Sequence, residues 1–382
     1  RECFEETAIL PRFQGDRSHL SFLHKQLLAK HLSFTEICQQ LSYAVPLLHM
    51  VNLGPRVTPP MMPVRFDTLY FLLTEESAWD IELLEAEAAE GGWLEPQHLL
   101  HQWQHFNAHM HPPVRDVLEV LNSECLSSAA IQHLQSLAND AETLYHRIAI
   151  FPGIEMIPLR TPTIPPATHT NCYLIGEERF LIIDPASPYP EEQTVLDHLL
   201  EERLKKGQQP IEILLTHHHQ DHIGGVNYLK ERFHLLVSAH AETASCLQGQ
   251  IAVDKLIQDG DVWDLGLDPY TQEPRKIEAL FTPGHAPGHI SFVDLRHRIA
   301  FVGDMLAGVG TILVALPDGN MTQYLASLQR LADSELSLIF PAHGPFIYHP
   351  KERCEFYIQH RLMREKKILE TLTDDNVLSL QD

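Results

Sequence analysis

Residue types that bind metals gather directly after one apolar run of the chain. The run IEILL predicts a buried strand, and it continues into THHHQDHIGG. Side chains alternate along a strand end, so His217 and His219 face one point while His218 faces away. The candidate ligands in this segment are His217, His219, Asp221 and His222. Imidazole and carboxylate together suit Zn²⁺ or another first-row divalent ion, and the segment lacks the thiolates of a closed structural zinc site.

Three further apolar runs end in a residue of the same kinds. They read IEALFTPGH, RIAFVGD and LSLIFPAHG, and their candidate ligands are His285, Asp304 and His343. Ligand sites in α/β sheets form at the carboxyl ends of strands. We therefore expect all seven residues to meet in one cleft.

The elements that must position these residues follow an α/β pattern. After about residue 150, short apolar runs alternate with helical stretches, which predicts packed layers of sheet and helix. Helices are expected at residues 191–206, 225–232, 321–332 and 351–372. The proline-rich stretch 152–166 favours a domain boundary near residue 150. The expected parts are a first domain at 1–110, a helical connector at 111–150 and a catalytic domain at 151–382.

The ligand pattern resembles that of the metallo-β-lactamase superfamily, over about residues 154–372. The resemblance implies an αββα sandwich that holds two divalent ions, with zinc as the expected metal. The implied ligand sets are His217, His219 and His285 for one ion, Asp221, His222 and His343 for the second, and Asp304 as the bridge. A hydroxide bridging the ions would attack the substrate, which makes Asp221 and Asp304 the expected catalytic residues. Asp184 and His289 are expected to orient the ligands from outside the metal site.

Two features select a branch of this superfamily. Hydrolases of thioesters and phosphodiesters use an aspartate bridge such as Asp304, whereas the true β-lactamases do not. The short interval from Asp304 to His343 leaves no room for the inserted domain of the RNA 3′-end-processing nucleases. Residues 303–331 and 339–369 resemble the β-lactamase-like-protein-2 branch, which includes a single-strand-specific endoribonuclease and polyketide-releasing thioesterases. The resemblance implies cleavage of a phosphodiester, with single-stranded RNA as the candidate substrate. Hydrolysis of CoA-type or glutathione-type thioesters is the alternative.

A locally basic helix is the place where RNA would bind. Residues 351–370 carry six Lys or Arg and four Glu, in a chain whose formal net charge is −23. The expected phosphate contacts are Arg361, Arg364, Lys366 and Lys367. A solvated helix with ion pairs four residues apart is the open alternative.

The first residues, RECFEETAIL, place Glu2, Glu5 and Glu6 on one helix face, where they could bind Mg²⁺. This segment resembles the second half of the Nudix box. The stretches RFDTLYFLL and EGGWLEPQHLL resemble later parts of that family, closest to its acyl-CoA diphosphatase branch. We expect residues 1–110 to form an incomplete Nudix-like α/β/α domain. Its alternative role is a nucleotide-binding or CoA-binding module that regulates the hydrolase.

The charge and cysteine content of the chain limit the binding partners and the cellular compartment that we expect. With 28 Lys and Arg against 51 Asp and Glu, the chain opposes broad association with nucleic acid or anionic membrane. Its six scattered cysteines form no Cys-x-x-Cys pair, which favours a reducing compartment. We expect a cytoplasmic protein without a membrane partner, and a small ester, a thioester or single-stranded RNA as its substrate. The sequence assigns no oligomeric state.

Overall fold

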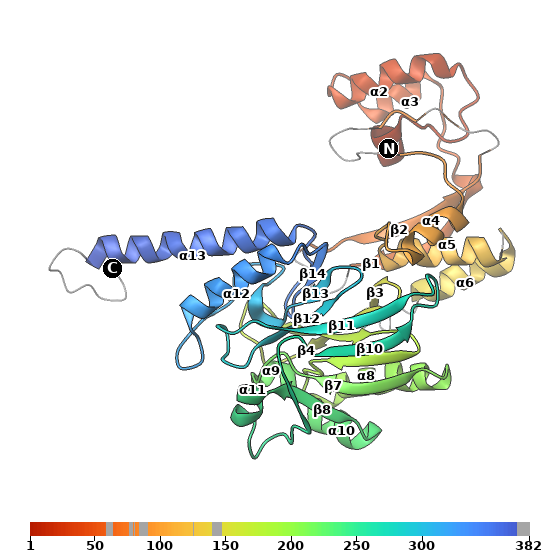
Figure 1. Cartoon of the computed structure of the whole chain (residues 1–382). Coiled ribbons are helices and arrows are strands. Elements are labelled where there is room, and N and C mark those ends of the chain that lie inside the picture. The colour runs from red at the N-terminus through yellow and green to blue at the C-terminus, as the bar shows by residue number, and fades with distance from the viewer. Residues whose placement is uncertain are drawn as a thin grey trace. The chain divides into compact units, whose positions relative to one another are not determined.

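The computed structural model describes residues 1–58, 64–75, 79, 81–83, 91–124, 126–139 and 147–372. The chain forms two compact units (Figure 1). The first unit takes residues 1–57, 66–102 and 113–141, and the second takes residues 58–65, 103–112 and 142–382. Within the described ranges, no helix combines the length and the apolar character needed to span a bilayer.

The elements before residue 140 are mostly helical and belong mainly to the first unit. They are α1 (Glu2–Thr7), η1 (Arg17–His19), α2 (Leu20–Leu28), α3 (Phe34–Gln40), η2 (Leu47–His49), β1 (Met50–Val57), β2 (Asp67–Leu73), α4 (Pro96–Gln104), α5 (Pro112–Glu124) and α6 (Ser128–Asn139). Strands β1 and β2 pair in antiparallel fashion. Leu53 of β1 packs with Val120 of α5 and with Ala130 and Leu134 of α6. Apolar side chains of α5 and α6, which lie in the predicted connector 111–150, thus pack with β1 and β2. The division into 1–110, 111–150 and 151–382 stays a prediction.

The second unit contains two sheets. Its strands are β3 (Ile148–Phe151), β4 (Ile154–Arg160), β5 (His169–Ile175), β6 (Arg179–Ile183), β7 (Gln209–Leu214), β8 (Leu236–His240), β9 (Lys255–Ile257), β10 (Val262–Leu267), β11 (Pro274–Phe281), β12 (Ile290–Asp294), β13 (Ile299–Phe301) and β14 (Leu338–Phe340). Its helices are α8 (Pro190–Lys205), α9 (Gln220–Ile223), α10 (Val226–Phe233), α11 (Ala241–Cys246), η3 (Gly303–Met305), α12 (Met321–Asp333) and α13 (Pro350–Leu372). One sheet runs in the order β3 to β9 and the other in the order β10 to β14, each in sequence order.

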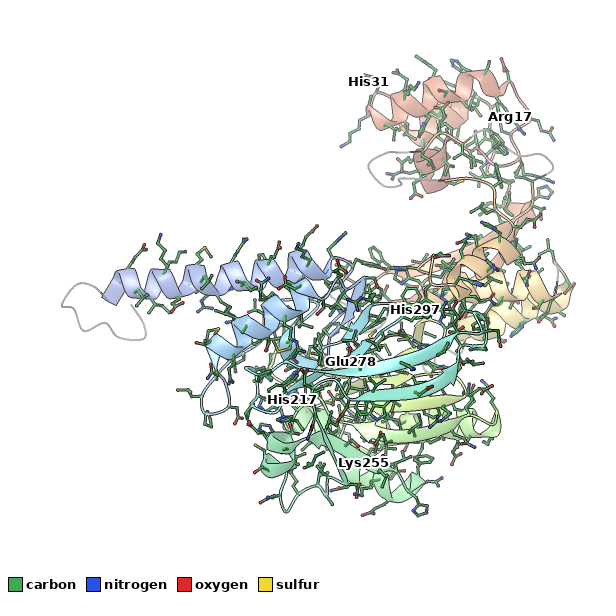
Figure 2. The ribbon with its side chains drawn as sticks, in the orientation of Figure 1. Arg17, His31, His217, Lys255, Glu278 and His297 are labelled. Atoms are coloured by element: carbon green, nitrogen blue, oxygen red, sulfur yellow. The ribbon has the colours of Figure 1, made fainter. Side chains whose placement is uncertain are left out.

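Alternation along the strands separates three apolar layers. Leu181 and Ile183 of β6 face the core between the two sheets, whose packed side chains Figure 2 shows. Phe180 and Ile182 of the same strand face the other way, toward Leu200 of α8. This period of two is what a strand covered on both faces requires.

The second sheet is covered in the same manner. Ala300 and Val302 pack with Leu328 of α12 and Tyr357 of α13. The order of layers is therefore helix, sheet, sheet, helix, and the predicted mixed α/β class with metallo-β-lactamase sheets is confirmed. The four helices predicted after residue 150 are found as α8, α10, α12 and α13.

Candidate metal centre

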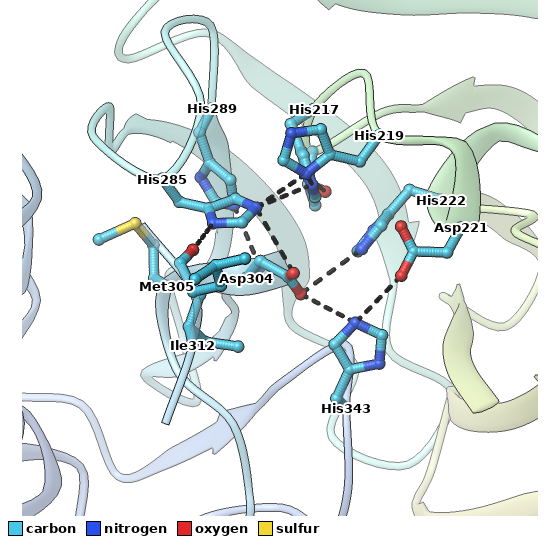
Figure 3. A network of polar contacts seen from close by, with 12 residues as sticks. His217, His219, Asp221, His222, His285, His289, Asp304, Met305, Ile312 and His343 are labelled. Carbon is cyan, nitrogen blue, oxygen red and sulfur yellow. Dashed lines mark hydrogen bonds and ion pairs between the residues drawn. The ribbon is translucent and has the colours of Figure 1, made fainter. Parts of the chain in front are cut away.

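Loops at the ends of four strands bring the predicted ligands together. The segment 217–222 follows β7 and enters α9, and His285 follows β11. Asp304 lies in η3 directly after β13, and His343 follows β14. Figure 3 shows these side chains pointing toward one another.

Three imidazole rings form the first ligand group. Nε2 of His285 lies 3.3 Å from Nε2 of His217 and 3.0 Å from Nδ1 of His219. Nε2 of His217 lies 3.0 Å from Nδ1 of His219. Nitrogen atoms that share a tetrahedral Zn²⁺ are about 3.3 Å apart, so this spacing fits one ion.

The second group combines carboxylates with two rings. Nε2 of His343 lies 3.5 Å from Oδ2 of Asp221 and 3.3 Å from Oδ1 of Asp304. Nε2 of His222 lies 3.5 Å from the same Oδ1 of Asp304. The other oxygen of Asp304, Oδ2, lies 3.5 Å from Nε2 of His285 in the first group. Each carboxylate oxygen of Asp304 therefore faces a different group, as a bridging ligand would.

The outer nitrogen of each ring already has a partner. His285 donates from Nδ1 to the carbonyl of Leu313 at 2.8 Å, and His343 donates from Nδ1 to the carbonyl of His169 at 2.9 Å. Nδ1 of His217 contacts Oγ1 of Thr216 at 3.0 Å. These contacts place the protons on the outer nitrogens, so the lone pairs of the inner nitrogens converge on the site.

Converging lone pairs and buried carboxylate require a positive charge. Nε2 of His222 and Oδ1 of Asp304 are buried without a hydrogen-bond partner. Burial opposes a charge on His222, yet Asp304 and Asp184 beside it raise the pKa of His222 well above its ordinary value. Burial similarly works against ionisation of Asp304, but His343 and His222 hold its pKa well below the usual range. The donor set of imidazole nitrogens and carboxylate oxygens fits two divalent ions.

Asp184 and His289 hold the ligands from behind. Asp184 accepts hydrogen bonds from the Thr216 amide at 2.8 Å, from the Thr216 hydroxyl at 2.5 Å and from Nδ1 of His222 at 2.8 Å. Nε2 of His289 accepts from the Asp304 amide at 3.2 Å. Burial holds the pKa of His289 well below its ordinary value, which keeps this nitrogen free to accept.

Gly303 makes room for this arrangement. Its φ of 48° lies in the left-handed region, and a Cβ there would lie 2.7 Å from Nε2 of His289 and 2.8 Å from Oγ1 of Thr216. Only glycine fits between these two side chains without moving them.

Sequence reasoning missed Asp318. Its Oδ2 lies 3.4 Å from Nε2 of His219, which is the ring nitrogen that points away from the other predicted ligands. It also lies 3.3 Å from Nε2 of His218, which turns toward Asp318 rather than toward the other ligands. The dipeptide Asp318-Gly319 marks a turn, but nothing local in the sequence links it to a histidine about a hundred residues away.

A cavity of about 420 Å³ opens onto the ligands. His219, Asp221, His285, Asp304 and His343 lie in its wall. The rest of the wall comes from residues 162–167 and 307–318 and is mainly apolar. This volume suits a small-molecule ligand.

Other predicted site residues lie elsewhere. Glu5 and Glu6 lie in α1, where Glu5 pairs with Arg1 at 3.0 Å. Among the described residues, every cluster of His, Cys, Asp or Glu that could hold a metal belongs to the second unit. The Mg²⁺ site at Glu2, Glu5 and Glu6 stays a prediction.

The predicted phosphate contacts all lie on α13. Arg361 donates from Nη2 to the carbonyl of Ile312, so it has a structural task that the sequence did not reveal. Arg364 and Lys367 are exposed, and Lys366 lies 3.7 Å from Glu370. Phosphate binding by these four residues stays a prediction.

Comparison with known proteins places this geometry in a family. Residues 165–343 match the model of the metallo-beta-lactamase superfamily. A "Beta-lactamase-like protein 2 homolog" of Caenorhabditis elegans is 27% identical over 217 residues, covering 56% of this chain and 68% of the relative. An "Atrochrysone carboxyl ACP thioesterase" of Emericella nidulans is 28% identical over 260 residues, covering 68% and 75%.

Two further matches bear on the same region. A "Hydroxyacylglutathione hydrolase" of Chelativorans is 40% identical over 121 residues, which cover 32% of this chain and only 42% of the relative. The crystal structure of a beta-lactamase domain protein from Burkholderia ambifaria superposes with a TM-score of 0.51 at 20% identity, covering 58% of this chain and 78% of that one. This likeness supports the fold.

Over residues 165–343, just under half of its length, the chain is thus similar to the metallo-beta-lactamase superfamily, and the superfamily homologues it matches are hydrolases. The superfamily resemblance predicted from the sequence is supported over these residues, and the matches include both a β-lactamase-like protein 2 homologue and a thioesterase. The resemblance of residues 1–110 to the Nudix family stays a prediction.

Proposed function

We propose that the chain is a dinuclear metal-dependent hydrolase of acyl thioesters that carry an apolar acyl group. The observation that supports this most strongly is the wall of the cavity at the metal ligands. Ile164, Val309, Leu313 and Leu316 contribute apolar surface to it, and no Lys or Arg of the described residues belongs to it. An uncharged acyl chain is favoured there, because its burial gains free energy without removing a charge from water.

The ligand set suits this chemistry. Two divalent ions held by it would supply Lewis acidity and lower the pKa of a water molecule. In hydrolysis, water adds to the carbonyl carbon, the C–S bond breaks, and a carboxylic acid and a thiol leave. Asp221, Asp304 and Asp318 are the carboxylates that the described residues contribute to the cavity wall. Asp221 and Asp304, the two expected from the sequence, are the candidates for accepting the proton of the attacking water.

Phosphodiester cleavage of single-stranded RNA, the first expectation from the sequence, is the second candidate. It is favoured by the exposed Arg364, Lys366 and Lys367 of α13. Among the described residues, however, no Lys or Arg lies in the cavity wall to contact the further phosphates of a polyanion. The net charge of −23 opposes the approach of RNA as well.

One experiment separates the two candidates. The full chain, loaded with zinc and checked by elemental analysis for two ions, is incubated with acetyl-CoA, hexanoyl-CoA, decanoyl-CoA, an S-acylglutathione and a single-stranded RNA in parallel. We expect thioester hydrolysis that rises with acyl length and no RNA cleavage at any salt concentration. The matched variant Asp304→Asn keeps the side-chain size but loses the bridging charge, and we expect it to lose all hydrolysis and part of its metal.

The alternative outcome is equally clear. RNA cleavage that falls steeply as salt rises, with every thioester left intact, would refute the thioesterase proposal and support the second candidate. Activity that survives both metal removal and Asp304→Asn would refute metal-dependent hydrolysis.

We also propose that residues 1–110 serve as a nucleotide-binding or CoA-binding regulatory module. The proposal is supported by the resemblance of their sequence to a truncated Nudix domain. Titration calorimetry of the full chain with ADP and with CoA, each with and without Mg²⁺, tests it. Saturable binding without turnover supports the module, whereas cleavage of a diphosphate bond would assign it an activity of its own.

A further inference from the structure

The loop at residues 306–313, here called the wall loop, has two tasks at the cavity. Val309, Ile312 and Leu313 contribute apolar surface to the cavity wall. Its backbone also contacts two metal-ligand segments: the Leu313 carbonyl accepts from Nδ1 of His285 at 2.8 Å, and the Gly308 amide donates to the His343 carbonyl at 2.9 Å. The position of this loop therefore determines both the shape of the acyl site and the support of two ligand residues.

Gly308 shows how closely the wall loop fits its surroundings. A Cβ at this position would lie 2.1 Å from the carbonyl oxygen of Pro345. The outer part of the loop has less support, because Val309 and Leu313 are 46% and 59% exposed. The loop therefore depends on contacts from other elements to keep one conformation.

Helix α13 provides these contacts from one face. Arg353 donates from Nη2 to the carbonyls of Ala307 at 2.9 Å and Gly310 at 3.0 Å. The hydroxyl of Tyr357 accepts from the Ala307 amide at 3.1 Å and donates to the Gly310 carbonyl at 2.9 Å. Arg361 donates from Nη2 to the Ile312 carbonyl. The three side chains are spaced four residues apart, so they share one face of the helix, where Arg353 and Tyr357 both contact Ala307 and Gly310 and the next turn places Arg361 at Ile312.

The chain before the wall loop is held in the same region. The Tyr324 hydroxyl donates to the Met305 carbonyl at 2.7 Å. The guanidinium of Arg361 lies 5.9 Å from the centre of the buried Tyr324 ring. Arg361 thus bridges α12 and the wall loop, which explains why it is half-buried while Arg364 is exposed.

We infer that Arg353, Tyr357 and Arg361 are positioning residues that set the acyl-chain selectivity of the site by holding the wall loop. None of the three contacts a metal ligand directly, so their effect on the reaction passes through the loop. The part of this inference that concerns acyl-chain selectivity rests on the proposed thioesterase function. The inference also gives Arg361 a role that rests on its carbonyl partner, Ile312.

The test compares Arg361→Ala with Lys351→Ala, which removes one exposed charge from the same helix but no contact with the loop. With the zinc-loaded full chain, we expect Arg361→Ala to lower the ratio of kcat/KM for decanoyl-CoA over acetyl-CoA by about tenfold, mainly through KM. Lys351→Ala should leave the ratio unchanged. Arg361→Lys should recover part of the ratio, because it keeps a charged donor without the planar fork of arginine.

A second readout does not depend on the substrate. Amide hydrogen exchange of residues 306–313 should be faster in Arg361→Ala than in wild type and unchanged in Lys351→Ala. Unchanged exchange in Arg361→Ala, or faster exchange with unaltered acyl selectivity, would overturn the inference. If the wild type hydrolyses no thioester, the thioesterase proposal fails, and the exchange measurement alone decides whether α13 holds the wall loop.

Discussion

Removal of the Asp318 carboxylate should weaken metal binding by a modest and measurable amount. Oδ2 of Asp318 lies 3.4 Å from Nε2 of His219, and the Asp318 side chain is 33% exposed. A carboxylate on the outer nitrogen of a ligand histidine fixes the ring and makes it a better ligand. Asp318→Ala should leave His219 without this partner while its ligand atom, Nδ1, is still present.

The structure sets the expected magnitude. Partners of ligand histidines typically contribute 10-fold to 100-fold in metal affinity. The long contact and the partial exposure of Asp318 place it at the lower end, about tenfold, which corresponds to about 1.4 kcal/mol of binding free energy. Asp184 is buried and accepts from Nδ1 of His222 at 2.8 Å, so its loss belongs at the upper end.

Competition with a coloured zinc chelator measures the affinity of the full chain directly. Asp318→Asn should retain most of the affinity, because the amide oxygen can still accept from Nε2 of His219. Asp333→Ala is a suitable control, because Asp333 is an exposed residue of α12 that accepts a hydrogen bond only from Gln329 among the contacts described for it.

Two results would refute the reasoning. Equal affinity in Asp318→Ala and wild type would show that the contact with His219 has no role in metal binding. Equal losses in Asp318→Ala and Asp318→Asn would show that the negative charge of Asp318, and not its hydrogen bond, supports the metal.

Two further predictions concern stability and assembly of the site. Burial lowers the pKa of His297 to about 4, and its ring stacks on Phe106 with the ring centres 3.5 Å apart. In the unfolded chain, His297 takes up a proton near pH 6.5, whereas in the folded chain it does so only near pH 4. The free energy of unfolding should therefore fall as the pH drops from about 6.5 toward about 4. In His297→Phe, the urea midpoint should lose this part of its pH dependence; an identical pH dependence in the variant would contradict the assignment. Gly303→Ala should cost about 1–3 kcal/mol through its left-handed backbone and should displace Asp304, lowering the zinc content measured by elemental analysis. A variant that retains two zinc ions and wild-type stability would disprove this steric explanation.

Much of the candidate centre could be predicted from local sequence. In THHHQDHIGG, strand alternation alone separates His217 and His219 from His218, and the structure turns His218 toward Asp318. His285, Asp304 and His343 could be added because each follows an apolar run that predicts a strand end. The helices of the second unit could also be predicted from local sequence, because the periodicity of their apolar residues is a local pattern.

The helices at 111–150 show what local sequence leaves open. Their periodicity correctly indicated helix, and α5 and α6 are present. It could not indicate that Val120 and Leu134 would pack with Leu53 of β1, because the partner of an apolar face is decided by contacts distant in sequence. A connector and a core element have the same local pattern.

The sequence by itself determined which residues could hold metal ions, because the side-chain type decides which atoms can bind a metal. At a strand end, residues two positions apart also point to the same side, so their spacing predicts which of them can meet. Only the tertiary structure decided how those ligands are held and what the cavity admits. The Leu313 and His169 carbonyls that orient His285 and His343 leave no trace in residue type, because every residue carries a carbonyl. The sequence likewise predicts a phosphate contact for Arg361, and only the tertiary structure shows that its Nη2 donates to the Ile312 carbonyl, because α13 passes beside that residue.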